Sequence, residues 1–307
     1  MKNLYCPVGL AIGMYAPLKY NADKSALQSK YGTYPILDEV LDIRCPSNQE
    51  VQSYDEIVPE WGYSKISEQK NKNLALVMQI NIENIAGKRV LLAGFGGGTE
   101  FRMLESLKPS EIYVVEYGNF ICDFAKKYKA TLDCKVRFYI GDICNLPFPD
   151  NYFDAVITSG IVHHTRTPEL AHRSMWRVLK QGGELNYGHI YKVSLHNRRV
   201  SVDRERFGFH LMDVNKAKKL LKLYTIFYTF LVNTRLLKLI NREWYRLPFL
   251  LELNGIPDKD YIYYRNNAFD YYLPKYRHIV YREDVLDWFE QCGVSATKTP
   301  KGFSGKK

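Results

Sequence analysis

Residues 90–100 read VLLAGFGGGTE, an apolar run that passes into a glycine-rich turn and then into a stretch with helical spacing. Glycine has no Cβ, so its backbone can turn tightly and a ligand can lie close to main-chain N–H groups at the start of a helix. A flexible strand-to-helix loop would be the structural alternative. The stretch predicts a strand, a turn and a helix, with a ligand at the turn.

The same pattern repeats through residues 88–190, where short apolar runs alternate with amphipathic stretches. This alternation favours an α/β fold: a Rossmann-like, doubly wound, mostly parallel sheet with helices on both faces. The expected strands are 89–93, 112–116, 136–140, 153–158 and 183–189, and the expected helices are 67–84, 99–107, 119–129 and 168–179.

The remainder of the chain departs from this alternation and suggests four parts. They are a small turn-rich lead (1–60), the main domain (61–190), a basic, aromatic-rich helical insertion (191–274) and a C-terminal part (275–307). Within the last two parts we expect helices over 216–241 and 282–291 and a strand over 294–299 that completes the sheet.

The composition indicates a folded chain whose charge is unevenly distributed. Of its 307 residues, 46% are hydrophobic and 25% charged, which excludes a disordered chain. The net charge is +10, yet residues 1–190 hold 21 Lys+Arg and 21 Asp+Glu, whereas residues 191–307 hold 22 and 12. The positive excess therefore belongs to the last third, which we expect to have a separate role.

The cysteines and apolar runs predict a cytoplasmic protein. Six cysteines are scattered without a C-x-x-C pair, which fits a reduced setting, and we find no export signal. The longest uncharged apolar run of the basic part, residues 223–234, has 12 residues. A membrane-spanning helix needs about 20, so we expect no transmembrane segment.

Two acidic residues follow the next two expected strands. Glu116 lies 20 residues after Gly96, a spacing at which a carboxylate can accept hydrogen bonds from ribose hydroxyls. Asp142, in the phrase GDICNLPF at 141–148, could accept from an exocyclic amine while Ile143 offers its backbone N–H, as an adenine edge requires. The alternatives are a glutamate that caps a strand end and an aspartate that closes its own turn.

Together with FDAVITSGIVHH at 153–164 and WRVLKQGG at 176–183, these motifs resemble the class I S-adenosylmethionine-dependent methyltransferases over residues 88–190. The resemblance implies S-adenosylmethionine as cofactor, with glycines of the turn around its methionine part, Glu116 at the ribose and Asp142 with Ile143 at the adenine. Many members have an acidic residue where this chain has Leu92. The candidate cofactor-binding residues are Gly94, Phe95, Gly96, Gly98, Glu116, Tyr117, Asp142, Ile143 and Ser159.

The candidate catalytic residues are His163 and His164, on the loop after the fourth strand. Methyl transfer from a sulfonium is an in-line displacement, so the protein mainly aligns the acceptor and, where needed, removes a proton. Either imidazole could be that base, and loop packing or substrate positioning is the alternative.

The first 45 residues resemble a short zinc-ribbon lead that precedes some of these enzymes. The expected ligands are absent: Gly9 stands where a second cysteine would follow Cys6, and Gln28 with Tyr31 occupy the other pair. We therefore expect no metal and interpret the lead as a degenerate, metal-free ribbon.

The predicted function is methyl transfer from S-adenosylmethionine to a small-molecule acceptor. The basic insertion would suit an anionic or lipid-linked acceptor, and we expect its main helix to bury its apolar stripe and keep its lysines in water. Three alternatives remain: an RNA methyltransferase, a nicotinamide-dependent oxidoreductase, and a non-catalytic protein that keeps the fold. The oligomeric state is not set by the sequence.

Overall fold

The computed structural model describes residues 4–11, 14–44, 55, 58, 74–190, 195–233, 261–300 and 302–307. In this part of the chain the strands form one sheet, in the order β1-β2-β3-β4-β7-β6-β5-β8-β9-β11-β10. The strands are β1 (Lys19–Tyr20), β2 (Ala26–Ser29), β3 (Gly32–Leu37), β4 (Val40–Asp42), β5 (Arg89–Ala93), β6 (Glu111–Glu116), β7 (Lys135–Ile140), β8 (Phe153–Thr158), β9 (Leu179–Tyr187), β10 (Thr297–Lys298) and β11 (Phe303–Lys306).

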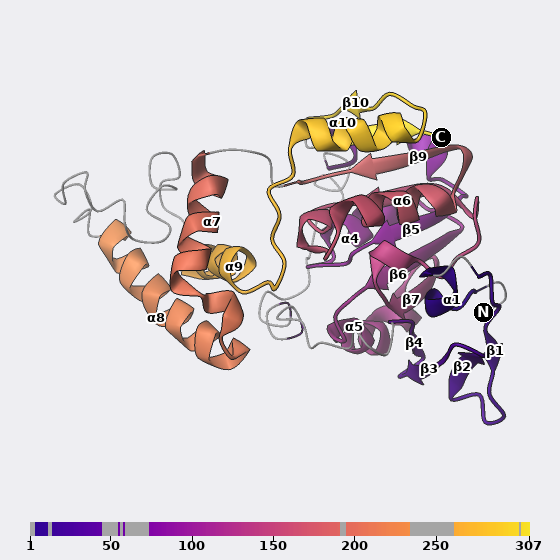
Figure 1. The fold of residues 1–307 in the computed structure, drawn as a ribbon, viewed down its shortest axis with the longest axis horizontal. Coiled ribbons are helices and arrows are strands. Elements are labelled where there is room, and N and C mark those ends of the chain that lie inside the picture. Colours follow the sequence, from indigo (N-terminus) through magenta and orange to yellow (C-terminus); the bar gives the residue numbers. More distant parts are fainter. Residues whose placement is uncertain are drawn as a thin grey trace.

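Helices cover both faces of the sheet (Figure 1). The α-helices are α1 (Pro7–Ala11), α4 (Thr99–Ser106), α5 (Phe120–Tyr128), α6 (Pro168–Val178), α7 (Leu195–Phe207), α8 (Val214–Asn233), α9 (Tyr261–Tyr272) and α10 (Arg282–Gln291). The short 3-10 helices are η2 (Ile82–Asn84), η3 (Lys129–Thr131), η4 (Ile143–Asn145), η5 (Val162–His164) and η6 (Phe209–Leu211).

The five central strands are parallel, as the alternation predicts. In the register, Leu91 of β5 lies opposite Tyr113 of β6 on one side and Val156 of β8 on the other. The expected lead is part of this sheet, because β1–β4 form an antiparallel meander whose last strand pairs in parallel with β7. At the opposite edge, β11 is antiparallel to both β9 and β10. The α/β fold class is confirmed, and the boundaries of the four parts stay a prediction.

Several predicted elements differ from those observed. The helix expected over 67–84 is helical at 74–77 but cannot reach 84, because Gln79 has φ +52° and η2 begins anew after Asn81. Strand β9 starts at Leu179 rather than 183, since α6 passes directly into extended backbone. Residues 67–73 and 234–241 of the expected helices lie outside the described residues.

The C-terminal strand pair was only partly predicted. The run expected over 294–299 forms just the two residues of β10, and no strand was predicted at β11, whose residues read FSGK. Gly305 explains why this strand lacks an apolar pattern: a Cβ there would overlap the ring of Phe289, so glycine admits the close packing of α10 on the sheet.

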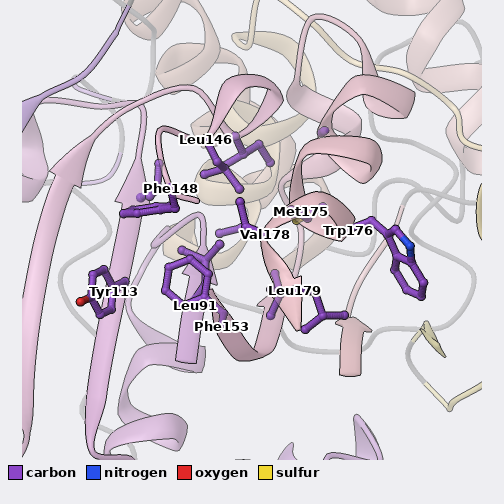
Figure 2. Close-up of a cluster of buried hydrophobic side chains, with 14 of the residues drawn as sticks. Leu91, Tyr113, Leu146, Phe148, Phe153, Met175, Trp176, Val178 and Leu179 are labelled. Carbon is purple, nitrogen blue, oxygen red and sulfur yellow. The ribbon is translucent and has the colours of Figure 1, made fainter. Parts of the chain in front are cut away.

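The alternation of strand side chains gives the sheet two apolar faces. One face includes Leu91, Tyr113 and Phe153, joined by Phe148 from the loop before β8, and packs against Met175 and Val178 of α6 (Figure 2). Residues of α10 belong to the same cluster. The other face packs against α4 and α5. Burying a side chain such as Phe153 fully contributes about 1.5–3 kcal/mol, so these clusters fix the sheet and the loops at its edge.

The helical insertion has its own small core, separate from the two faces of the sheet. Helices α7 and α8 pack against α9 through a cluster that includes Val200, Leu221 and Phe269. Figure 1 shows these helices beside one end of the sheet domain. In the described parts of the chain, no helix combines the length and the apolar character needed to cross a membrane.

Candidate functional site

A cavity of about 710 Å³ lies at the carboxyl ends of the central parallel strands. Its floor comes from the loops that follow β5, β6, β7, β8 and β9, and its opposite wall comes from α9 and the residues after it. The carboxyl edge of an open parallel sheet is where such folds place their ligands. The fold therefore creates a site where the sequence motifs meet.

Ten of the eleven predicted site residues line this cavity. They are Gly94, Phe95, Gly96, Glu116, Tyr117, Asp142, Ile143, Ser159, His163 and His164. Gly98 is outside the lining: it is the N-cap of α4 with φ +81°, and a Cβ there would lie 3.1 Å from the ring of Phe95. Gly98 therefore shapes the turn, and the cavity is lined by its neighbours Gly97 and Thr99.

The glycine turn depends on two residues with positive φ. Gly94 has φ +91°, and a Cβ there would overlap the side chain of Ile161 from the loop after β8. Gly96 has φ +51°, with nothing within 4 Å of the position that a Cβ would take. A side chain at Gly96 would therefore both strain the backbone and project into open space beside the cavity lining.

The carboxylate of Glu116 connects this turn to the end of β6 through hydrogen bonds. Its Oε2 accepts hydrogen bonds from the backbone N–H of Phe95 (2.8 Å) and Gly96 (3.4 Å), and its Oε1 accepts from the N–H of Gly118 (3.0 Å). Burial raises the pKa of Glu116, and the backbone donors oppose that rise. The side chain is buried rather than a surface cap, and its two oxygens can accept further hydrogen bonds.

Asp142 closes its own turn and also lines the cavity. Its Oδ1 accepts from the backbone N–H of Cys144 at 2.8 Å, which makes it the N-cap of η4. The alternative that Asp142 closes its own turn is thus correct for its Oδ1, while Oδ2 is not used in this hydrogen bond. The adjacent Gly141 lets the chain pass close to Ile43 and Val115, since a Cβ would come within 2.7 Å and 3.1 Å of their side chains.

The two histidines of η5 are buried against the insertion. The His163 and His164 rings lie 4.4 Å apart, and His163 also faces His189 at 6.2 Å. Burial lowers the pKa of His163 well below its usual value, and the neighbouring His164, His189 and Arg277 lower it further. His163 is therefore neutral at pH 7.

His164 has a different electrostatic environment. Its Nδ1 lies 3.0 Å from the backbone oxygen of Tyr276, so the neutral ring donates from Nδ1 and carries its basic lone pair on Nε2. The Nε2 lies 3.6 Å from Oδ1 of Asp270. Burial lowers the pKa of His164, while the Asp270 carboxylate raises it. A proton accepted at Nε2 would be stabilised by that carboxylate.

The far wall of the cavity was missed by the sequence analysis. Its residues carry no motif and all lie after residue 260: Asn266, Asn267, Asp270, Lys275 and Tyr276. Arg204 of α7 holds this wall, because its guanidinium donates to the backbone oxygens of Tyr272 (3.3 Å) and Lys275 (2.8 Å). His189 was also missed, although its place at the end of the fifth expected strand could have indicated it.

The lead contributes a different environment around Cys6. The Cys6 Sγ lies 3.0 Å from the hydroxyl of Tyr34, inside the first apolar cluster. Among the residues that the structure describes, no three His, Cys, Asp or Glu side chains are grouped so as to hold a metal ion. Cys45 lies outside those residues.

Comparison with protein families gives one match. Residues 91–186 match the family described as "Methyltransferase domain". The matched stretch begins in β5 and ends in β9, so it contains the glycine turn, Glu116, Asp142 and both histidines. The lead and the helical insertion lie outside it.

Relatives match about a third of this chain. A chloroplastic 2-methyl-6-phytyl-1,4-hydroquinone methyltransferase from Spinacia oleracea is 30% identical over 104 residues, which cover 33% of this chain and 30% of the relative. A ubiquinone/menaquinone biosynthesis C-methyltransferase from Dinoroseobacter shibae is 35% identical over 104 residues, covering 33% and 41%. The chain thus spans less than half the length of these curated relatives.

Solved structures are similar at a lower level of identity. One from Thermotoga maritima, described as "SAM-dependent methyltransferase, possible histamine N-methyltransferase", is 17% identical with a TM-score of 0.42 and covers 83% of this chain and 98% of that chain.

Proposed function

We propose that this chain transfers a methyl group from S-adenosylmethionine to a small-molecule acceptor. The observation that carries the proposal is the convergence of the glycine turn, Glu116 and Asp142 on one cavity, inside the stretch that matches the methyltransferase domain. When bound, the cofactor supplies an electrophilic methyl on its sulfonium and leaves as a neutral thioether.

The floor of the cavity fits that cofactor. The open space beside Gly96 is a cradle that a Cβ would fill, next to main-chain N–H groups at the start of α4. Glu116 has acceptor capacity for the ribose hydroxyls, and Oδ2 of Asp142 can accept from the adenine amine. Phe95, Tyr117, Ile143 and Ser159 complete the proposed binding surface.

We assign the acceptor to the opposite wall, where His164 and Asp270 face each other. In this proposal His164 removes the acceptor's proton at Nε2, and Asp270 stabilises the resulting imidazolium. The pKa of His163 falls further than that of His164, through burial and the neighbouring histidines and Arg277, which favours a packing role over a catalytic one. The proton acceptor is thus His164 rather than its neighbour.

The acceptor we propose is a small molecule, anionic or lipid-linked. Arg166 and Lys275 line the cavity and suit a negatively charged group. The named activities of the relatives, on a phytyl hydroquinone and in quinone biosynthesis, support a small acceptor. An RNA acceptor is less favoured, because residues of α9 stand over the cavity.

We also propose that residues 1–60 are a metal-free, ribbon-like remnant. The cytoplasmic location stays a prediction.

The test is calorimetric titration of S-adenosylmethionine into the chain, into D142N and into D142A. Asparagine keeps an oxygen for the Cys144 N–H but weakens the acceptor offered to adenine, so D142N should lose about tenfold in affinity and D142A more. Reduced nicotinamide dinucleotide serves as the competing ligand. Unchanged affinity in both variants, or tighter binding of the nicotinamide, would overturn the proposal.

A further inference from the structure

Helix α8 has two apolar faces, and within the described part of the chain one of them is buried while the other is exposed. Ala217 and Leu221 are buried and pack with α9 in the core of the insertion. On the outward side, five large apolar side chains are between 40% and 65% exposed: Leu220, Leu223, Ile226, Phe227 and Phe230. Their spacing of three and four residues places them on one face of the helix. The expected burial of the apolar stripe therefore holds for one face and fails for the other.

Exposed apolar side chains are concentrated at this helix. Of the fifteen large hydrophobic side chains that are exposed in the described chain, seven lie in residues 195–233. Single exposed hydrophobic residues are normal on a protein surface, but a contiguous row is typical of an interaction site. The row on α8 therefore indicates an interaction site.

The charge of α8 specifies what kind of partner it is. The helix carries lysines 216, 218, 219 and 222 and no acidic residue in its twenty positions. Lys216 and Lys219 are exposed, and helical spacing puts them on the same face as the apolar row, one or two turns toward the N-terminus. A second copy of α8 brings no acidic residue to these lysines in either orientation, whereas lipid phosphates would complement them.

We propose that α8 attaches the protein to the surface of an anionic lipid bilayer. The helix is about 30 Å long and would lie in the interface, with Leu223, Ile226 and Phe227 at the acyl boundary and Lys216 with Lys219 among the headgroups. This arrangement is peripheral and needs no membrane-spanning segment. Basic, aromatic-rich amphipathic helices bind membranes by this combination of apolar burial and charge attraction.

The attachment has a consequence for the acceptor. Helix α8 packs on α9, and α9 supplies Asn266, Asn267 and Asp270 to the cavity wall. In the view of Figure 1, α8 lies on the side of α9 away from the sheet. A bilayer at α8 would hold the acceptor side of the cavity near the lipid, which fits a lipid-linked acceptor; this consequence alone depends on the proposed function.

The test is co-sedimentation of the full chain with vesicles of phosphatidylcholine alone and with vesicles of phosphatidylcholine and phosphatidylserine in equal amounts. We expect binding to the mixed vesicles that weakens as salt is raised. The double variant I226E/F227E should lose at least about tenfold in vesicle affinity, and K216Q or K219Q about fivefold each.

The control is the double variant L76E/L170E. It makes the same change in charge at two exposed leucines of the sheet domain and should bind the mixed vesicles as the unaltered chain does. Circular dichroism at increasing temperature confirms that each variant is folded. Equal loss in both double variants, or a dimer in sedimentation that I226E/F227E dissociates while no vesicles are bound, would overturn the proposal. S-adenosylmethionine titration of the same samples tests the proposed function separately.

Discussion

The two walls of the cavity are built in different ways. The floor consists of loops directly after parallel strands, and its shape depends on backbone: positive φ at Gly94 and Gly96, and main-chain N–H groups held by Glu116. The opposite wall consists of side chains on α9, a helix held by Arg204 rather than by the sheet. The floor therefore tolerates few substitutions, while the other wall can change its chemistry without changing the fold.

The largest expected effect is on cofactor binding at the floor of the cavity, and a matched variant distinguishes it from an effect on folding. In G96V, the new side chain occupies the space beside the turn, and we expect S-adenosylmethionine binding to fall below detection in calorimetry. The matched control is G182V, since Gly182 also has positive φ (+76°) and open space but lies in β9, away from the cavity. Both variants should lose about 1–2 kcal/mol of stability from backbone strain, and G182V should bind normally.

The next effect tests the opposite wall. H164Q should lower kcat about a hundredfold, because it removes the proposed base, while the affinity for S-adenosylmethionine stays unchanged. D270N should lower kcat about tenfold. Since the Asp270 carboxylate raises the pKa of His164, its removal lowers that pKa and moves the acid limb of the pH–rate profile to lower pH. A weakened cofactor affinity in either variant, with kcat intact, would place these residues on the cofactor side instead.

The last prediction concerns folding stability alone, in the packing beneath α6 and remote from the site. His172 is buried with its Nδ1 2.8 Å from the Tyr187 hydroxyl, and burial lowers its pKa to about 4. Between pH 6.5 and 4 the His172 imidazole is protonated in the unfolded chain but neutral in the folded chain. As the pH is lowered through this range, the free energy of unfolding therefore falls by up to about 1.4 kcal/mol per pH unit from this group.

Denaturant unfolding at a series of pH values measures this contribution. H172Q should be less stable at pH 7, because it disturbs packing against Trp176 and Phe289, but its stability should fall less steeply toward acid. An unchanged slope would mean that the buried histidines beside the insertion, His163 and His164, account for the acid sensitivity.

The central sheet and the floor of the cavity could be predicted from local sequence patterns. Apolar runs that alternate with amphipathic stretches locate β5–β9, and carboxyl ends of parallel strands share one edge, so Gly96, Glu116 and Asp142 had to meet. These inferences succeed because they depend on contacts that are local in sequence or repeat regularly along a strand. Gly98 shows the limit, because the sequence could not distinguish a glycine that lines the cavity from one that packs on Phe95.

The opposite wall, the strand β11 and the exposed face of α8 depend on contacts between residues far apart in the sequence. His164 contacts the backbone of Tyr276, 112 residues later, and no periodicity links such positions. Strand β11 forms by pairing with β9, and Gly305 leaves room for the ring of Phe289 to pack against it. Both faces of α8 are apolar in sequence, and which one stays exposed depends on how α9 packs against it. Long-range packing selects among surfaces that local patterns leave equivalent.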